Sequence, residues 1–203
     1  MEKNYEGLNE KKMRKAVRSL FKVVKFLDKH NIHYTLEGGT LLGIVRDNSL
    51  LPWDHDVDVA IDLKDAKKLN KLRFRMLFSG YRVTMRKSKR EFGAIKEGQI
   101  RIFKVKQLIP SIMKEIFPKA LERLVITDIF VKASDDKHTY WMAMEKIMRV
   151  DKKYYEGYEE LEFEGVKLKT PMHYKDYLTE KYGDWSIPVK DWVCGHDEKT
   201  ICD

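Results

Sequence analysis

The chain has 203 residues, 43% of them hydrophobic, which is typical of one folded domain with a real core rather than of a disordered chain. No apolar run approaches the roughly 18 residues that a membrane-spanning helix needs, and the first residues lack the apolar core of a signal peptide. Two cysteines give no disulfide framework. We therefore expect a single cytoplasmic domain over residues 1–203.

The formal net charge of +8 suits an anionic substrate, an anionic membrane surface or nucleic acid. Lysine and arginine are spread along the chain, with one local concentration in residues 82–90. No zinc-finger spacing or RNP aromatic motif is present, which disfavours nucleic acid. We interpret the 82–90 run as a solvated hairpin. Contact with an anionic acceptor or with the membrane periphery is the alternative.

The N-terminal third predicts a helix, a strand and a glycine-led helix in that order. Residues 9–30 place apolar side chains on one helical face and lysines elsewhere, as an amphipathic helix does. Residues 32–36 favour a short strand, and Gly38-Gly39 then opens a short helix through Leu42. A second strand is predicted at 56–61, where valine and isoleucine alternate with aspartate.

The rest of the chain predicts a mixed α+β order. Asp62 is placed to cap a helix that runs to about Phe78 and ends at Ser79-Gly80. Later elements are a hairpin with strands at 81–85 and 94–105 and turns at Gly93 and Gly98, a helical stretch from Pro110 that Pro118 interrupts, a strand at 124–131, and a helical part over about 138–190. The order predicts a small mixed sheet flanked by helices.

Asp54, Asp56 and Asp58 fall within five residues, at the start of the predicted strand and just before it. Alternate residues of a strand face the same side, so we expect the three carboxylates to share one face. Like charges this close repel strongly unless a cation neutralises them, and a hard divalent metal such as Mg²⁺ or Mn²⁺ prefers oxygen ligands. Asp54 is equally suited to shaping the turn or to binding a second metal.

Asp128 lies in the middle of the apolar run 124–131. An unpaired carboxylate is costly in a dry core, so it points either to solvent or to a site. Ile126 and Phe130, on the same face of the strand, are apolar, which argues against the solvent-facing alternative. A pair of carboxylates on one strand and a third on its neighbour is the nucleotidyltransferase arrangement, so Asp128 is expected as a third ligand or as a general base.

Gly38 and Gly39 precede the acidic strand and begin a helix. Glycine lets the backbone approach a ligand closely, and the first N–H groups of a helix bind phosphate well. Arg46 follows that helix, where it could pair with a phosphate oxygen or lie on the surface. An acidic strand beside a glycine turn therefore predicts phosphoryl chemistry.

These segments resemble the LicD/fukutin family of phosphotransferases, which have a nucleotidyltransferase-like fold. The matching segments are Gly39-Thr-Leu-Leu-Gly-Ile-Val-Arg46, Pro52-Trp-Asp-His-Asp-Val-Asp-Val59, Thr127-Asp-Ile-Phe130, and two closing motifs at 163–171 and 177–185. They occur in the family's order over roughly residues 32–190. One departure is His55, where many bacterial members have another aspartate.

The resemblance implies transfer of a phosphorylated alcohol, of the phosphocholine or alditol phosphate type, from a CDP-activated donor to a hydroxyl of a glycan or glycolipid. It assigns metal binding and catalysis to Asp56, Asp58 and Asp128, and substrate binding to Gly38, Gly39, Thr40 and Arg46. Two alternatives stay open. One is a nucleotidyltransferase that moves a nucleoside monophosphate from an NTP, and the other is a catalytically silent binding module.

Two further features carry little weight. Cys194, His196 and Cys202 offer three local ligands where structural zinc usually takes four. Tyr174, Tyr177, Tyr182 and Trp185 are more typical of residues that close a core than of a platform for stacking a base.

Overall fold

The computed structural model describes residues 10–54, 56–108, 126–189 and 192–202. Its strands are β1 (Tyr34–Leu36), β2 (Asp56–Asp62), β3 (Tyr81–Lys87), β4 (Ile100–Gln107), β5 (Ile126–Ser134), β6 (His138–Ala143), β7 (Lys146–Asp151), β8 (Glu159–Phe163) and β9 (Val166–Thr170). Its helices are α1 (Glu10–Lys29), α2 (Gly38–Asp47), α3 (Leu63–Leu72) and α6 (Tyr174–Tyr182), with the 3₁₀ helices η1 (Arg73–Ser79) and η2 (Lys152–Tyr155).

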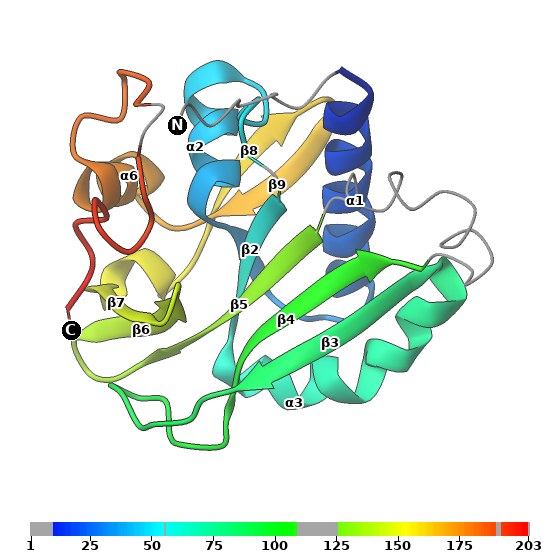
Figure 1. Cartoon of the computed structure of the whole chain (residues 1–203), viewed down its shortest axis with the longest axis horizontal. Helices are drawn as coiled ribbons and strands as arrows, with labels where there is room; N and C mark the ends of the chain where they lie inside the picture. The colour runs from blue at the N-terminus through cyan, green and yellow to red at the C-terminus, as the bar shows by residue number, and fades with distance from the viewer. Residues whose placement is uncertain (1–9, 55, 109–125, 190–191, 203) are drawn as a thin grey trace, which may run out of the picture.

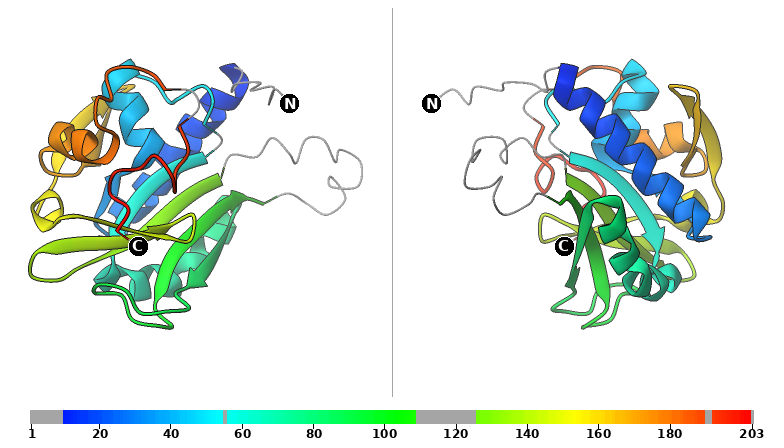
Figure 2. Two further views of the ribbon diagram at one scale, coloured as in Figure 1. Left: turned by 60° about the vertical axis from the view of Figure 1, so that its left-hand side comes forward. Right: turned by 90° about the vertical axis from the view of Figure 1, so that its right-hand side faces the viewer.

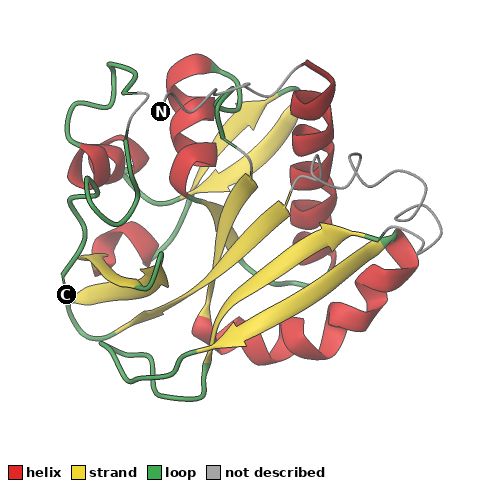
Figure 3. Cartoon of the chain, viewed as in Figure 1, coloured by secondary structure: helices red, strands yellow, loops and turns green. Residues whose placement is uncertain are grey.

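A seven-stranded mixed sheet forms the centre, with β1, β2, β5, β4 and β3 in that spatial order and β6 and β7 extending it from β5 (Figure 1). β2 runs parallel to β5, and β1 and β4 are antiparallel to their neighbours. β8 and β9 form a separate hairpin. The fold is α+β, a mixed sheet flanked by helices, as the sequence predicts (Figure 3).

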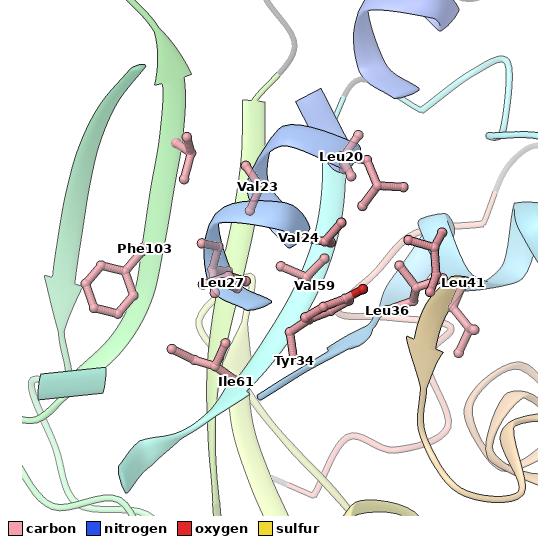
Figure 4. Close-up of a cluster of buried hydrophobic side chains, with 14 of the residues drawn as sticks. Leu20, Val23, Val24, Leu27, Tyr34, Leu36, Leu41, Val59, Ile61 and Phe103 are labelled. Carbon is pink, nitrogen blue, oxygen red and sulfur yellow. The ribbon is translucent and has the colours of Figure 1, made fainter. Parts of the chain in front are cut away.

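Helix α1 packs its apolar face on one side of the sheet, against β2 and β5 (Figure 2). Leu20, Val23 and Leu27 of this helix are fully buried, and they point toward Val59 and Ile61 of β2 (Figure 4). Leucine and valine recur here every three or four residues, which is why the helix buries one stripe. Truncating one of these side chains to alanine typically costs about 2–5 kcal/mol of stability.

The two faces of β2 differ in chemistry because its side chains alternate. Val57, Val59 and Ile61 are buried in the core under α1, whereas Asp56 and Asp58 project to the opposite side and line a cavity. The same helix therefore fixes the direction of both carboxylates, since turning the strand over would bury them in the core.

Several predicted boundaries are confirmed. Residues 10–29 are helical, β2 occupies 56–62, and Asp62 caps α3 by accepting a hydrogen bond of 2.7 Å from the backbone N–H of Lys64. The predicted helix to Phe78 changes to 3₁₀ geometry at Arg73 and ends at Gly80, whose φ is 78°. The helix that begins at Gly38 runs to Asp47 rather than Leu42, because its residues up to Ile44 remain buried.

Two predictions are wrong. The second hairpin strand begins at Ile100 rather than 94, because Gly93 and Gly98 take positive φ and the residues between them form a connection. The helical part expected over 138–190 instead contains the strands β6, β7, β8 and β9, with α6 its one helix of regular α geometry among the described residues. Side chains in 138–151 and 159–170 alternate between the two faces of a strand, which favours hairpins. The turns lie at Met144-Glu145 and Glu164-Gly165, and all four residues have positive φ.

Other predictions fall partly or wholly outside the described residues. The helical stretch from Pro110 and the first two residues of the strand at 124–131 lie there, as does His55. In the part of the chain that the structure describes, no helix combines the length and apolarity that crossing a membrane requires.

Candidate active site

Asp56, Asp58 and Asp128 meet on one side of the sheet. β2 and β5 are parallel neighbours, and their register places Asp58 directly beside Asp128. One carboxylate oxygen from each of the three residues lies within 4.8 Å of the others. Among the described residues this is the one group of three or more carboxylate, histidine or cysteine side chains close enough to share a metal ion.

The carboxylates raise the free energy of one another's ionised forms. Burial contributes most, followed by the neighbouring carboxylates of Asp56 and Asp54, and together they raise the pKa of Asp58 well above its usual range. Burial also raises the pKa of Asp128, against a hydrogen bond from Lys104 that lowers it. A cation bound among these oxygens would relieve both effects.

Asp128 has one occupied and one open oxygen. The ammonium of Lys104 donates a hydrogen bond of 2.5 Å to Oδ2. Oδ1 is buried and has no hydrogen-bond partner in the described part of the chain. A buried carboxylate oxygen without a partner is costly, and a bound cation would satisfy it.

The start of α2 lies against the same carboxylates. Gly38 has a φ of 55°, and a Cβ placed on it would lie 2.6 Å from Oδ2 of Asp58. A Cβ on Gly39 would clash in the same way with Oδ2 of Asp54. The positive φ of Gly38 disfavours any other residue there, and a Cβ at either position would displace a carboxylate.

Thr40 holds the acidic strand rather than facing the cavity. Its hydroxyl accepts a hydrogen bond of 2.8 Å from the backbone N–H of Asp58, and the residue is buried. The backbone N–H of Glu37 donates to the carbonyl of Asp58 in turn, over 3.1 Å. These two bonds hold the helix start to β2 and place Thr40 to position Asp58, while its role in substrate binding stays a prediction.

The carboxylates open into a cavity of about 630 Å³. One wall is basic and is formed by Arg86 of β3 with Arg101 and Lys104 of β4. Other residues of the lining are apolar or aromatic: Trp53, Trp141, Met142, Trp185, Ile187 and Trp192. A lining of this mixed kind can hold a ligand with one charged and one less polar group.

Arg46 and Asp54 also line the cavity, and neither belongs to the group of three whose oxygens lie within 4.8 Å of one another. The guanidinium of Arg46 donates to Asp47 through Nε (2.9 Å) and Nη2 (2.8 Å), and through Nη1 to the carbonyl of Trp185 (3.5 Å). Arg46 therefore ties the end of α2 to the segment after α6 while one side of it faces the cavity.

A buried network of charged residues lies behind the start of α2. Glu37 forms ion pairs with Lys132 (2.5 Å) and Lys181 (3.3 Å), and Lys181 pairs with Glu198 (2.5 Å). All four side chains are almost fully buried. Tyr177 donates a hydrogen bond of 2.5 Å to Glu37.

Burial and pairing compete in this network. Burial would raise the pKa of Glu37, but Lys132 and Lys181 outweigh it and lower the pKa to about 2. Burial lowers the pKa of Lys132 to about 8 despite its contact with Glu37. The two carboxylates of the network balance its two ammonium groups in charge. Glu37, which precedes Gly38, is therefore held in place by Lys132 of β5 and Lys181 of α6.

The sequence reasoning missed Lys104, Arg101, Glu37, Lys132 and Glu198. The argument applied to Asp128 would have found two of them, because Lys104 and Lys132 are also charged residues inside apolar strands. Glu37 and Glu198 carry no comparable signal. Their partners are distant in sequence, and only the fold brings them together.

Tyrosine and cysteine residues of the C-terminal part take mixed positions. Tyr177 is buried in the core, whereas Tyr182 and Trp185 line the cavity. Cys194 donates to Glu198 over 3.5 Å, and Cys202 is exposed.

Comparison with known proteins gives one family. The model described as LicD/FKTN/FKRP, nucleotidyltransferase domain, matches residues 31–173. Ribitol 5-phosphate transferase FKRP of Homo sapiens is 45% identical over 51 residues, which are 25% of this chain and 10% of that protein. The lipopolysaccharide cholinephosphotransferase LicD of Haemophilus influenzae is 47% identical over 32 residues, 16% of this chain and 12% of that protein. The match thus spans about a tenth of the length of either relative.

One solved structure with a similar arrangement is the lincosamide antibiotic adenylyltransferase LnuA with lincomycin bound. It is 13% identical, with a TM-score of 0.46 over 85% of this chain and 86% of that one.

Proposed function

Because this chain belongs to the LicD/FKTN/FKRP family of nucleotidyltransferase domains, we propose that it is a metal-dependent phosphotransferase. The proposed reaction moves a phosphorylated alcohol, of the phosphocholine or alditol phosphate type, from a CDP-activated donor to a hydroxyl of a glycan or glycolipid. The names of the two curated relatives support this class of reaction. The observation that carries the proposal is the convergence of Asp56, Asp58 and Asp128 on one cavity.

The residues present fit a divalent cation of the Mg²⁺ or Mn²⁺ type. Three carboxylates supply the oxygen ligands that such cations prefer, and the open Oδ1 of Asp128 is one of them. In the proposed enzyme Asp56, Asp58 and Asp128 hold the cation. Its chemistry there is to neutralise the charge of the phosphate that is transferred.

The chain's own residues would position the phosphate and neutralise its charge. Gly38 and Gly39 let the start of α2 lie against the carboxylates of Asp58 and Asp54, which places the helix N-terminus, a favourable end for phosphate, at the edge of the same cavity. Arg86, Arg101 and Lys104 provide positive charge in the lining of the same cavity, where Arg101 is paired with Glu145 and Lys104 with Asp128. In phosphoryl transfer such positioning and charge stabilisation supply most of the rate acceleration.

Asp128 is the general base in the alternative arrangement, in which Asp56 and Asp58 alone hold the cation and Oδ1 of Asp128 is left to accept a proton. The acceptor's hydroxyl oxygen bonds to phosphorus, its proton passes to the carboxylate of Asp128, and CMP leaves with the electron pair of the broken P–O bond. A carboxylate whose pKa is raised by burial is a better proton acceptor than an exposed one.

The test is to incubate the purified protein with CDP-choline, CDP-ribitol or CDP-glycerol and to measure CMP by chromatography, with and without EDTA. We expect CMP release from at least one donor, lost with EDTA and in Asp58→Asn. Asp62→Asn is the matched control, because it lies on the same strand outside the cavity and asparagine also caps a helix. Pyrophosphate release from an NTP, with no CMP from any donor, would replace the proposal with nucleotidyl transfer.

A further inference from the structure

The 3₁₀ helix η1 displays apolar side chains to solvent. Phe74, Leu77 and Phe78 are 59%, 40% and 94% exposed, while Met76 between them is buried and anchors the helix. In a 3₁₀ helix residues three apart are eclipsed, so Phe74 and Leu77 share one face. An aromatic side chain that is almost fully exposed is unusual for a folded protein, and grouped exposure of this kind marks an interaction surface.

A fourth apolar residue joins them through the β3–β4 hairpin. The backbone N–H of Leu108, which is 41% exposed, donates a hydrogen bond of 2.7 Å to the carbonyl of Gly80. This bond brings the end of β4 to the end of η1. We call Phe74, Leu77, Phe78 and Leu108 the η1 patch.

The segment that carries η1 is basic on both sides of the helix. Residues 66–90 contain ten lysines and arginines and no aspartate or glutamate. Arg82 and Lys106 are exposed and form a cross-strand pair next to the end of the hairpin, and the guanidinium of Arg73 lies 4.8 Å from the ring centroid of Phe74. Positive charge therefore lies next to the apolar side chains of the η1 patch.

From this combination we infer that the η1 patch is a peripheral membrane-binding surface that inserts its apolar side chains among anionic lipid headgroups. A bilayer surface offers negative charge over an apolar layer, which is the complement of apolar side chains that protrude from a ring of cations. Arginine and lysine keep their charge at headgroup level while their stems lie along the apolar boundary. A second copy of this chain is a poor occupant, because two such basic surfaces repel.

The surface lies away from the candidate active site. In Figure 1 the helix that continues from α3 lies at the lower right, opposite α6. β3 carries Arg82 near the patch and Arg86 at the cavity, so one hairpin connects the two regions. The inference rests on exposure and charge alone and stands whichever reaction the cavity performs.

The first experiment measures co-sedimentation of the full chain with phosphatidylcholine vesicles and with vesicles that also contain phosphatidylserine. We expect binding to the anionic vesicles that weakens with salt and that falls roughly tenfold or more in Phe74→Ser/Phe78→Ser. Val193→Ser is the matched control, since Val193 is 57% exposed and lies outside both regions. Arg75→Glu/Arg82→Glu should also lose binding, whereas Lys175→Glu on α6 should keep it.

The second experiment asks whether the patch inserts. In Phe78→Trp, brominated lipids should quench fluorescence beyond the level seen in the wild type, which already contains four tryptophans. The inference is overturned if the wild type does not bind anionic vesicles. It is also overturned if Phe74→Ser/Phe78→Ser binds them as well as the wild type does. Two other results overturn it when vesicles are not bound. One is that the substitutions abolish binding to a single-stranded oligonucleotide, and the other is that they abolish a concentration-dependent dimer.

Discussion

Lys104 and Asp128 face each other across the β4–β5 pair, and the lysine ammonium lies 2.5 Å from one oxygen of the carboxylate. The other oxygen stays open toward Asp56 and Asp58. The lysine thus offsets part of the charge of the acidic group while leaving it able to bind a cation.

Lys104→Met should tighten metal binding and slow turnover. A positive charge about 4 Å from another costs about 1 kcal/mol in water and more near a protein surface, so its removal should strengthen Mn²⁺ binding at least fivefold. Turnover should fall because the basic wall loses a charge. Titration calorimetry and CMP release measure the two effects. Lys106→Met, exposed on the same strand, is the control, and equal Mn²⁺ affinity in all three proteins would contradict the prediction.

Asp58→Asn should stabilise the metal-free protein at neutral pH. The pKa of Asp58 is raised in the folded state, so its ionisation opposes folding once the pH exceeds its ordinary value. Removing the charge should raise the melting temperature by about 2–4 °C per kcal/mol regained. Added Mg²⁺ should stabilise the wild type and not the variant.

Calorimetry of wild type, Asp58→Asn and Asp62→Asn with and without Mg²⁺ distinguishes these effects. If Mg²⁺ shifts the melting temperature of wild type and Asp58→Asn equally, Asp58 does not bind the cation.

Removing only one partner of the Glu37–Lys132 ion pair should lower the free energy of unfolding markedly. Lys132→Met leaves a buried carboxylate with one partner fewer, and such single removals typically cost about 3–5 kcal/mol. The double variant Glu37→Gln/Lys132→Met removes both charges and should be more stable than Lys132→Met. Urea unfolding at neutral pH measures the difference, and a double variant that is less stable than either single one would refute the pairing.

The same pair predicts a pH dependence. The pKa of Glu37 is about 2 in the folded protein against an ordinary 4.5, so the unfolded chain binds more protons between these values. The stabilisation is complete above pH 4.5 and is lost as the pH falls toward 2. It is on the order of 3 kcal/mol. In urea unfolding at several acidic pH values, the double variant should lose less stability than the wild type over this interval.

Arg46→Ala should weaken donor binding by about tenfold to a hundredfold, if Arg46 exchanges part of its pairing with Asp47 for a phosphate. Arg46→Lys keeps the charge but loses the two-nitrogen contact, so its donor affinity should lie between those of the wild type and Arg46→Ala. Calorimetric titration with the CDP-alcohol that the protein turns over gives the dissociation constants. An unchanged constant in Arg46→Ala would restrict Arg46 to holding α2 against Trp185.

The sequence by itself determined the acidic strand and its partner. Aspartates that alternate with valines, and one aspartate inside an apolar run, carry their meaning in the local pattern, because strand geometry alone sets which side chains share a face. The glycines are equally local, since the close approach they permit depends on the absence of a Cβ. The hairpins of 138–170 show the same local alternation, and the helical part predicted there is wrong because that alternation sets the structure.

Only the tertiary structure decided which charges meet. Lys104 reaches Asp128 through the antiparallel register of β4 on β5, and Glu37 reaches Lys132 across 95 positions of sequence and Lys181 across still more. Register and long-range contact depend on how every element packs at once, and no short segment encodes them. The local sequence therefore specified the carboxylates, and the fold brought the lysine side chains next to them.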